Sequence, residues 1–477
     1  MRDASRSAGE VDPDSAPDPD PVHEPDAPTT RRGLLAGGAA LTTAALAGCS
    51  SLPIVGDEEP RLGFDPKTLP TSLVTSLPAR PSVYPGPVPD QLAAHHRQRA
   101  RTLLEEVPAD LSFPNGMITK RLRRNRKDAA QLLREGPDEG ETTPLERLDH
   151  WSYVRMDIAE VWGAYHAATG DVDATTLASR REEIRHDLVD FERAWDYPGT
   201  DVVSALAVNR RFEDLRTSCR RSLTPHRRAP DAPTAAVFRM GSLVRDLERA
   251  RSELDDLTGL HDAYRNSVSS TLSSYRANLP ILAQRLDELV AVSRQQVAPY
   301  LADDARPSDF ERDVEGLPAE ELFVEARRTA GWRIDDAERA RNRGNDARAA
   351  ILSAQALVGI VALSTVVDAI RAGKYGMPDS VAVIERHRDA AVEALDRVSS
   401  LDPSLLATVL TSPAWDVIDE QSYTFQQVTE REREHVGELD QSDVVSVDAA
   451  FGLALHLARA VPEVLRRVRS EVLTVEN

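Results

Sequence analysis

Apolar residues recur at spacings of three and four positions along most of the chain after Asp90. This period places apolar side chains on one face of an α-helix, whereas half-buried strands alternate apolar and polar residues. Three stripes are especially regular: Leu148, Trp151, Val154, Ile158, Val161 and Tyr165; Leu272, Tyr275, Leu279, Leu282, Leu286 and Leu289; and Val447, Phe451, Ala454, Ala458, Val461, Leu465 and Val468. The pattern predicts an all-α body, a multi-helix bundle with coiled-coil-like helix pairs.

Further helices are expected between glycine- and proline-rich breaks. They cover residues 91–107, 116–134, 174–196, 201–222, 234–257, 319–342 and 380–399. Pro280 either kinks the helix of the second stripe or starts a new helix after Asn278. The third stripe continues across Pro462.

The segment from Ala349 to Ile370 is the most apolar part of the body and is long enough to span a bilayer. It also contains polar residues, among them Gln355 and Asp368, and a charge inside a membrane span is costly. A helix that is apolar on most sides is equally typical of the centre of a large bundle. We therefore expect a buried central helix rather than a membrane span.

The amino terminus carries the most specific motifs of the chain. The pair Arg31 and Arg32 is followed by an uncharged run from Gly33 to Gly48. These 16 residues are rich in Gly, Ala and Thr and fall short of the roughly 20 mostly apolar residues that a membrane span needs. The run therefore indicates a processing segment, and it resembles a twin-arginine translocation signal.

The run ends in a four-residue motif made of Leu46, Ala47, Gly48 and Cys49. The motif resembles a lipobox, whose cysteine becomes the lipidated first residue after cleavage. Residues 29–49 are thus similar to the signals of twin-arginine-exported lipoproteins. The resemblance implies a signal peptide over 1–49, export by the twin-arginine translocase, a lipid on Cys49, and a location on the extracellular face of the cell membrane.

Proline content separates the segment after this signal from the body. Nine of the 31 prolines lie between Pro53 and Pro89. Proline-rich segments favour extended backbone and act as spacers, so we expect a disordered signal, a flexible tether over 50–90 and an all-helical body over 91–477. A second proline-rich stretch at 225–233 marks a possible subdivision of the body.

The charge of the chain limits its partners. With 78 acidic and 58 basic side chains the formal net charge is −20, and all but four basic residues are arginine. At this charge, nonspecific attraction to nucleic acid or to anionic lipid is not expected, so we expect no nucleic-acid partner. The acidic surplus with Arg in place of Lys resembles the proteins of haloarchaea, in which multimolar salt screens self-repulsion within about 3 Å. An acidic protein from another GC-rich genome is the alternative.

Two Glu-x-x-His pairs suggest metal ligands, because residues at i and i+3 share a helix face. The pairs are Glu183 with His186 and Glu432 with His435. The second pair lies in a charged run that is typical of a solvated helix end. Because both pairs also arise by chance in a chain so rich in Glu, we assign no metal site and keep Glu183 and His186 as candidates only.

A third pattern imitates a calcium loop. Asp171 and Asp173 are followed by Glu182 at the twelfth position, but Thr176 stands where the sharp-turn glycine is expected. A helix-to-helix turn capped by Asp173 or Thr175 explains the same residues. Both interpretations stay open.

Three other features have structural explanations beside functional ones. His95 and His96 are adjacent and point about 100° apart on a helix, so they do not chelate a metal together. Cys219 lies among arginines that would activate a thiol, yet a half-buried small side chain is the more common role. The basic cluster over 121–127 is suited to anionic headgroups or an acidic partner, although we favour a counter-charged helix face.

Familiar catalytic motifs are missing from the sequence, including the nucleophile elbow, phosphate-binding loops, HExxH and CxxC. We assign no catalytic residue and expect no cofactor. The sequence favours a lipid-anchored cell-surface protein that binds or scaffolds, with the membrane and an unidentified surface or membrane protein as partners. The alternatives are a metal-binding bundle enzyme or carrier, and a solute-binding lipoprotein of a transporter, which normally needs two α/β lobes.

Overall fold

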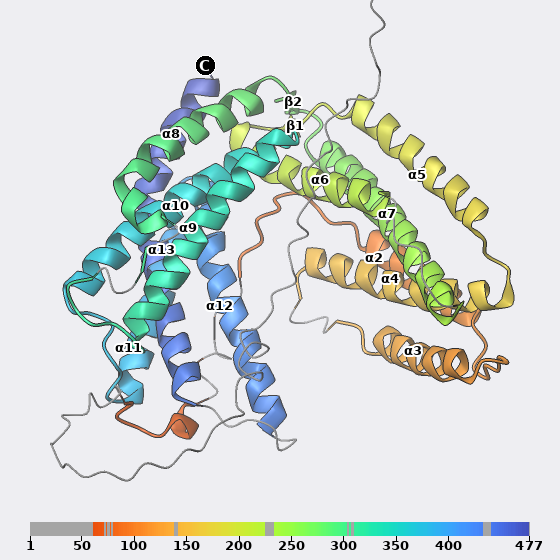
Figure 1. The fold of residues 1–477 in the computed structure, drawn as a ribbon. Coiled ribbons are helices and arrows are strands. Elements are labelled where there is room, and N and C mark those ends of the chain that lie inside the picture. Colours follow the sequence, from red (N-terminus) through yellow and green to blue (C-terminus); the bar gives the residue numbers. More distant parts are fainter. Residues whose placement is uncertain are drawn as a thin grey trace, which may run out of the picture. The chain divides into compact units, whose positions relative to one another are not determined.

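Helices make up nearly all of the chain that the structure describes. The computed structural model describes residues 61–70, 73, 77, 80–137, 142–224, 233–302, 305–306, 310–432 and 440–476, excluding the side chains of 233–234 and 422–432. These residues form twelve α-helices, a short 3-10 helix η2 (Pro66–Thr68) and two strands of two residues each (Figure 1). The predicted all-α fold is confirmed.

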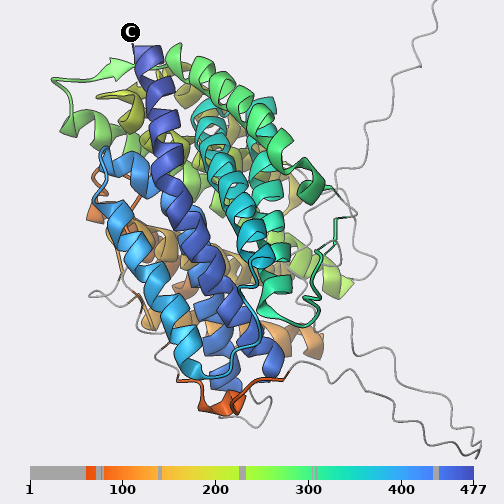
Figure 2. The same ribbon diagram turned by 90° about the vertical axis from the view of Figure 1, so that its left-hand side faces the viewer.

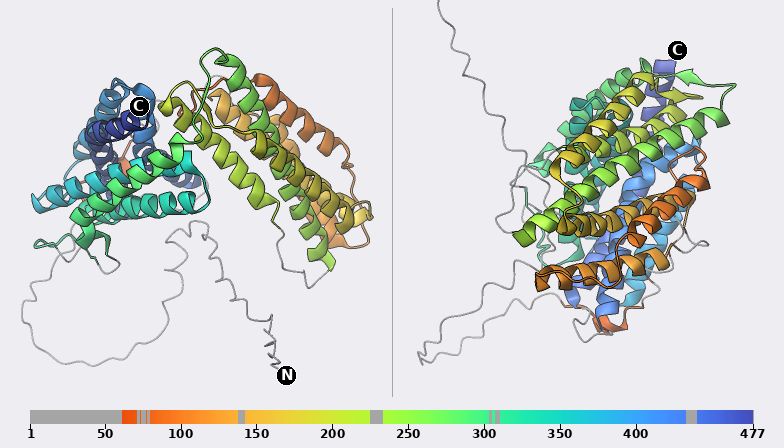
Figure 3. Two further views of the ribbon diagram at one scale, coloured as in Figure 1. Left: turned by 90° about the horizontal axis from the view of Figure 1, so that it is seen from above. Right: turned by 90° about the vertical axis from the view of Figure 1, so that its right-hand side faces the viewer.

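Six helices form the amino-terminal half: α2 (Asp90–Glu105), α3 (Gly116–Arg134), α4 (Pro144–Thr169), α5 (Ala174–Ala194), α6 (Val202–Ser222) and α7 (Pro233–Ser267). Helix α4 packs against α2, α3 and α7, and α7 also contacts α5 and α6 (Figure 3). The strands β1 (Pro198–Gly199) and β2 (Ser273–Ser274) pair antiparallel and tie the turn before α6 to the segment after α7.

The carboxy-terminal half has six more helices: α8 (Asn278–Leu301), α9 (Pro318–Asn342), α10 (Asp346–Arg371), α11 (Val381–Ser399), α12 (Ser404–Glu432) and α13 (Gln441–Glu476). Helix α10 packs against α8, α9, α12 and α13, while α13 also contacts α11 (Figure 2). Helix α10 contacts α6 as well, so the two halves share packing.

Local sequence explains where the helices begin and end. The hydroxyl of Thr143 accepts from the backbone of Glu146, whose side chain accepts in return, and this capping box starts α4 directly before Pro144. Gly170 ends the same helix with φ +85°, a left-handed conformation that glycine adopts without strain. These two signals determine where α4 begins and ends, and α4 directs polar side chains toward α2 and α7.

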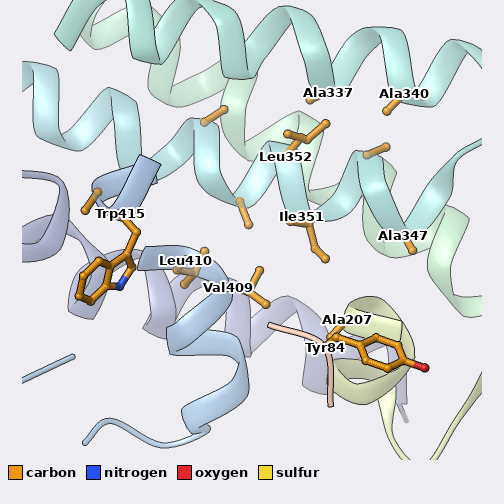
Figure 4. Packing of buried hydrophobic residues seen from close by; sticks show 14 of the residues in the cluster. Tyr84, Ala207, Ala337, Ala340, Ala347, Ile351, Leu352, Val409, Leu410 and Trp415 are labelled. Atoms are coloured by element: carbon orange, nitrogen blue, oxygen red, sulfur yellow. The ribbon is translucent and has the colours of Figure 1, made fainter. Parts of the chain in front are cut away.

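Helix α10 is the buried central helix that the sequence predicts. Most of its side chains between Ala347 and Ile370 are buried, although Ser364, Thr365 and Asp368 are exposed. The buried Gln355 donates from Nε2 to the carbonyl of Val409 at 2.8 Å. Figure 4 shows Ile351 and Leu352 between residues of α9 and α12. Helices α10 and α13 are long and apolar enough to cross a membrane, but 83% of the apolar window of each is buried inside the body.

Several helix predictions need correction. Helix α8 begins at Asn278, so Leu272 and Tyr275 of the second stripe lie outside it. Helix α7 extends ten residues beyond the expected end at 257, and α12 was not predicted at all. Helix α13 runs through Pro462 as expected. The missed helix α12 starts directly after Pro403 and contains Pro413, and those prolines obscure its pattern.

Described residues within 50–90, the range expected to be a flexible tether, are packed on the body. Leu69 and Leu73 are buried in a small apolar cluster with α11 and α13, and Leu62 and Phe64 pack against it. Further along, Tyr84 joins the main core and its hydroxyl lies 3.4 Å from the carbonyl oxygen of Leu260. Proline-rich backbone can pack on a protein surface as well as lie in solvent, so proline content alone does not separate tether from body.

Candidate functional site

A network of buried charged side chains occupies the centre of the amino-terminal half. The charged network, as we call it below, consists of His96 and Arg99 from α2, Arg155 from α4, and Glu248, Asp255 and Asp256 from α7. His96, Arg155, Glu248 and Asp256 are each at most 3% exposed. Charged side chains are rarely buried to this degree unless they are paired.

His96 bridges two other members of the network. Its Nδ1 lies 2.9 Å from Nη1 of Arg155, and its Nε2 lies 2.7 Å from Oδ1 of Asp256. A guanidinium carries only donors, so Nδ1 must accept and the ring hydrogen is assigned to Nε2, which donates to Asp256. Both ring nitrogens of His96 are therefore occupied.

Arg155 joins all three helices of the network. Its Nε donates to Oε1 of Glu248 at 2.9 Å, and its Nη1 donates to Oδ2 of Asp255 at 3.1 Å. Glu248 also accepts from Nε of Arg99 at 3.0 Å. Burial alone raises the pKa of a carboxyl, but the guanidinium groups of Arg155, Arg99 and Arg180 hold the pKa of Glu248 below its ordinary value.

Helical spacing brings these residues together. His96 and Arg99 lie one turn apart on α2, and Glu248, Ser252 and Asp255 follow one another at i, i+4 and i+7 on α7. On α4, Ser152 lies one turn before Arg155, and its hydroxyl is 2.5 Å from that of Ser252. The polar seam thus continues along α4 and α7.

A cleft of about 600 Å³ opens beside the charged network. It is lined by residues of α2, α5 and α7, namely Gln91, Leu92, His95, His96, Asp187, Arg251, Leu254, Asp255, Thr258 and Gly259. Arg251 spans it, with Nη1 2.8 Å from Oδ2 of Asp187 and Nε 3.2 Å from Oδ1 of Asp255. The exposed side chain of His95 adds a further polar group to the wall.

The chemistry of this site favours binding. Arg155 and Asp256 hold both ring nitrogens of His96, so the imidazole of His96 is a fixed part of the cleft wall. A polar group that enters the cleft can exchange hydrogen bonds with His95, Thr258 or Arg251. The size of the cleft suits a small polar molecule or one side chain of a partner.

A second polar cluster lies in the carboxy-terminal half. The hydroxyl of Tyr375 lies 3.1 Å from Nε2 of His456, and Oγ1 of Thr365 lies 2.8 Å from Nδ1 of the same ring. Nearby, Nδ1 of His387 is 2.6 Å from Oδ1 of Asp448, which is fully buried. Tyr375 adopts a left-handed φ of +61°, which is strained for a residue with a Cβ.

Burial shifts the titration of this second cluster. It lowers the pKa of His456 to about 4, assisted by the positive charges of Arg459 and Lys374. It raises the pKa of Tyr375 to about 12, with the charge of Asp448 adding to the effect. Both side chains are therefore neutral at neutral pH.

The metal candidates of α5 lie apart from both clusters. Glu183 and His186 are exposed, and Nδ1 of His186 pairs with Oδ2 of Asp190 at 3.4 Å. His435 lies outside the described residues, as does the side chain of Glu432. Within the part of the chain that the structure describes, no group of three His, Cys, Asp or Glu residues is arranged to hold a metal ion.

The calcium-like pattern forms a capped turn. Asp173 is the N-cap of α5 and accepts from the backbone nitrogen of Thr176 at 2.8 Å and from its hydroxyl at 2.9 Å. Asp171 accepts from the hydroxyl of Thr169 at 2.6 Å. Glu182 pairs with Arg185 along α5. The structure therefore matches the capping interpretation of these residues.

Two other sequence features are also located. Cys219 is fully buried, its thiol donates to the carbonyl of Ala250 at 3.3 Å, and burial raises its pKa above the usual range, so it is not an activated nucleophile. The basic cluster over 121–127 lies on α3, and its expected counter-charges are not found among the described residues. The signal residues Arg31, Arg32, Leu46, Ala47, Gly48 and Cys49 lie outside the described part.

Sequence reasoning missed the charged network. Of its members only His96 was singled out, and its partner Asp256 lies 160 residues further along the chain. The available signal was the occurrence of charged residues inside otherwise apolar helix faces, as at Arg155 between Val154 and Ile158.

Two family models match the body. Residues 91–271 match a model described as a domain of unknown function, DUF8262, and residues 276–470 match one described as a domain of unknown function, DUF8264. No curated protein and no solved structure matches the chain. The two matched ranges meet at β2, between α7 and α8, whereas the possible subdivision expected from the sequence lies near 225–233.

Proposed function

We propose that this chain is a twin-arginine-exported lipoprotein that holds an all-helical binding or scaffolding body against the extracellular face of the cell membrane. The signal-like residues 29–49 support export and lipidation at Cys49. The helical body, with a polar cleft and no αβ lobes among its described residues, supports binding by the bundle surface instead of a two-lobed solute trap.

The packing of Leu62, Phe64, Leu69 and Leu73 carries this proposal. Leu62 and Phe64 contact the apolar cluster on α11 and α13 only 13 residues after Cys49. The twelve residues from 50 to 61 span at most about 40 Å when fully extended. A lipid on Cys49 would therefore keep the body within a short distance of the bilayer, where a partner in the same membrane is reached at high effective concentration.

Detergent-phase partitioning of cell extracts tests the anchor. We expect the wild-type protein in the detergent-rich phase and Cys49→Ser in the aqueous phase or the medium, because the variant lacks the thiol that carries the lipid. Cys219→Ser is the matched control and should partition like the wild type. Retention of Cys49→Ser in the detergent phase would contradict the proposal.

The export route is tested separately. Replacing Arg31 and Arg32 together by Lys keeps the charge but removes the twin-arginine motif, so we expect the precursor to accumulate inside the cell. Crosslinking on intact cells in native salt, followed by mass spectrometry, then identifies surface or membrane proteins bound by the body. Recovery of the chain alone would argue against a scaffolding role.

A further inference from the structure

Helix α3 presents a face of unpaired positive charge on a strongly acidic protein. The helix holds seven basic residues against one acidic residue, while the whole chain has a net charge of −20. We define its basic face as Lys120, Arg123, Arg124 and Lys127, which are all exposed. Arg123, Arg124 and Lys127 follow Lys120 by three, four and seven residues. This spacing places all four on one side of the helix, over about 10 Å along its axis.

Apolar contacts and two arginines fix α3 to the body. Ile118, Leu122 and Ala129 are buried against neighbouring helices. Nε of Arg123 donates to the carbonyl of Leu111 at 2.9 Å, and Nε of Arg126 donates to that of Val107 at 2.8 Å. These contacts hold the helix on the body, while Lys120, Arg124 and Lys127 are exposed.

The basic face has no acidic partner within the protein. None of its four residues forms an ion pair with a carboxylate in the part of the chain that is described. Met117, one turn before Lys120, is 68% exposed and is the most exposed large apolar side chain among the described residues. Cations beside an exposed apolar side chain are suited to the headgroup layer of an anionic bilayer.

The described residues begin close in sequence to the proposed lipid. Leu62 and Phe64 pack against the body, so residues 50–61 alone lie between these contacts and Cys49. A lipid on Cys49 would therefore hold the body near the bilayer without fixing which face meets it, and the cations of α3 would supply that orientation.

We infer that the basic face of α3 binds anionic lipid headgroups and orients the body on the membrane. This inference rests on the proposed lipid anchor, which supplies the proximity. In concentrated salt, attraction beyond about 3 Å is screened, so direct contacts between these cations and headgroup phosphates or sulfates carry the binding. The four side chains are exposed, and only Arg123 donates a hydrogen bond to the body, so they can make such contacts without breaking any ion pair among the described residues.

Vesicle co-sedimentation of the full chain carrying Cys49→Ser tests the inference without the lipid. The vesicles contain either phosphatidylcholine alone or phosphatidylcholine with 30 mol% (roughly one lipid in three) phosphatidylglycerol, enough to give an anionic surface. The test variant replaces Lys120, Arg124 and Lys127 by Gln and leaves Arg123 in place, because Arg123 also holds the preceding loop. The control variant replaces Arg294, Arg343 and Arg466 by Gln and changes the net charge equally.

We expect the parent chain to bind the anionic vesicles and not the neutral ones. The affinity for anionic vesicles should fall by about tenfold or more in the α3 variant and by less than about twofold in the control. Equal binding by the α3 variant and the parent, binding to neutral vesicles, or binding to polyglutamate without binding to vesicles would each overturn the inference. Circular dichroism verifies that both variants keep their helix content.

If Cys49 is lipidated in cells and the vesicles show no binding, the proposed function stands and this inference fails. If Cys49 carries no lipid, the proposed function fails whatever the vesicles show.

Discussion

Oε2 of the Glu213 carboxyl group in α6 lies 2.7 Å from the backbone nitrogen of Arg348 in the first turn of α10. A second bond, from the backbone nitrogen of Ala347 at 3.1 Å, completes the contact. Glu213 belongs to the range that matches DUF8262 and α10 to the range that matches DUF8264. The side chain therefore satisfies two amide groups at the start of the central helix and joins the two matched regions.

Replacing Glu213 by Ala should lower the free energy of unfolding by about 1–3 kcal/mol, because two buried amide groups lose their acceptor. Urea unfolding followed by circular dichroism measures the change. Glu182→Ala on the exposed face of α5 is the matched control, with an expected effect near zero. A loss in Glu213→Ala no larger than in this control would contradict the contact.

The same residue predicts a dependence of stability on pH. Burial raises the pKa of Glu213 to about 8 against 4.5 for the free side chain. The folded chain therefore holds a proton that the unfolded chain releases, and the contribution of Glu213 is favourable below about pH 4.5 and is lost as the pH rises to 8. Glu213→Gln has no proton to lose, so the difference in unfolding free energy between wild type and variant should change by more than about 1 kcal/mol between pH 5 and 8. A constant difference over this range would refute the assignment.

His456 predicts the opposite trend at acid pH. Its pKa is lowered to about 4 in the folded state from 6.5, so the unfolded chain binds the proton first. Stability contributed by neutral His456 is complete above about pH 6.5 and is lost as the pH falls toward 4. His456→Gln should weaken this acid sensitivity, whereas His186→Gln, on an exposed site, should not. Identical pH profiles for the two variants would show that His456 is not buried as described.

Removing the positive charge of Arg155 from the charged network should lower the free energy of unfolding. Arg155→Met leaves Glu248 and Asp255 without their shared donor and removes the donor to Nδ1 of His96, so we expect a loss of about 3 kcal/mol or more. Arg193→Met on the exposed side of α5 is the control, with an expected effect below about 1 kcal/mol. Chemical denaturation in native salt measures both. Similar midpoints for the two variants would contradict the network.

Proteolysis tests whether Leu69 and Leu73 pack against α11 and α13. Leu73 is 2% exposed, and Leu73→Glu should release the segment from α11 and α13. Trypsin cleavage after Lys67 should then accelerate about tenfold or more, because protease access follows local detachment. Val292→Glu, at a position that is 62% exposed, introduces the same charge without this effect. An unchanged cleavage rate in Leu73→Glu would indicate that the segment is already free.

The sequence predicts the helical fold more completely than it predicts the charged network. The helical period identifies α4, α10 and α13 because long apolar faces are a local property. Tyr84 and Leu73 were assigned to a tether because proline content describes backbone preference and not what the apolar residues between prolines contact. The pairing of His96 with Asp256 depends on the packing of α2 against α7, which no local spacing encodes.

Adjacent residues illustrate the same limit. His95 and His96 are rotated by about 100° on α2, and the structure places His95 at the surface and His96 in the core, although both line the same cleft. Which of the two is buried depends on the register of α2 against α4 and α7. The basic cluster of α3 was expected to face counter-charges, because the surrounding chain is acidic. No ion pair joins a carboxylate to these cations within the part of the chain that the structure describes, and this arrangement depends on how the helices pack.

The most direct test of the central claim is mass spectrometry of the mature protein isolated from the membrane fraction. We expect an amino-terminal peptide that begins at Cys49 and carries the added mass of a lipid. A mature chain that begins at Met1, or at Cys49 with an unmodified thiol, would contradict it.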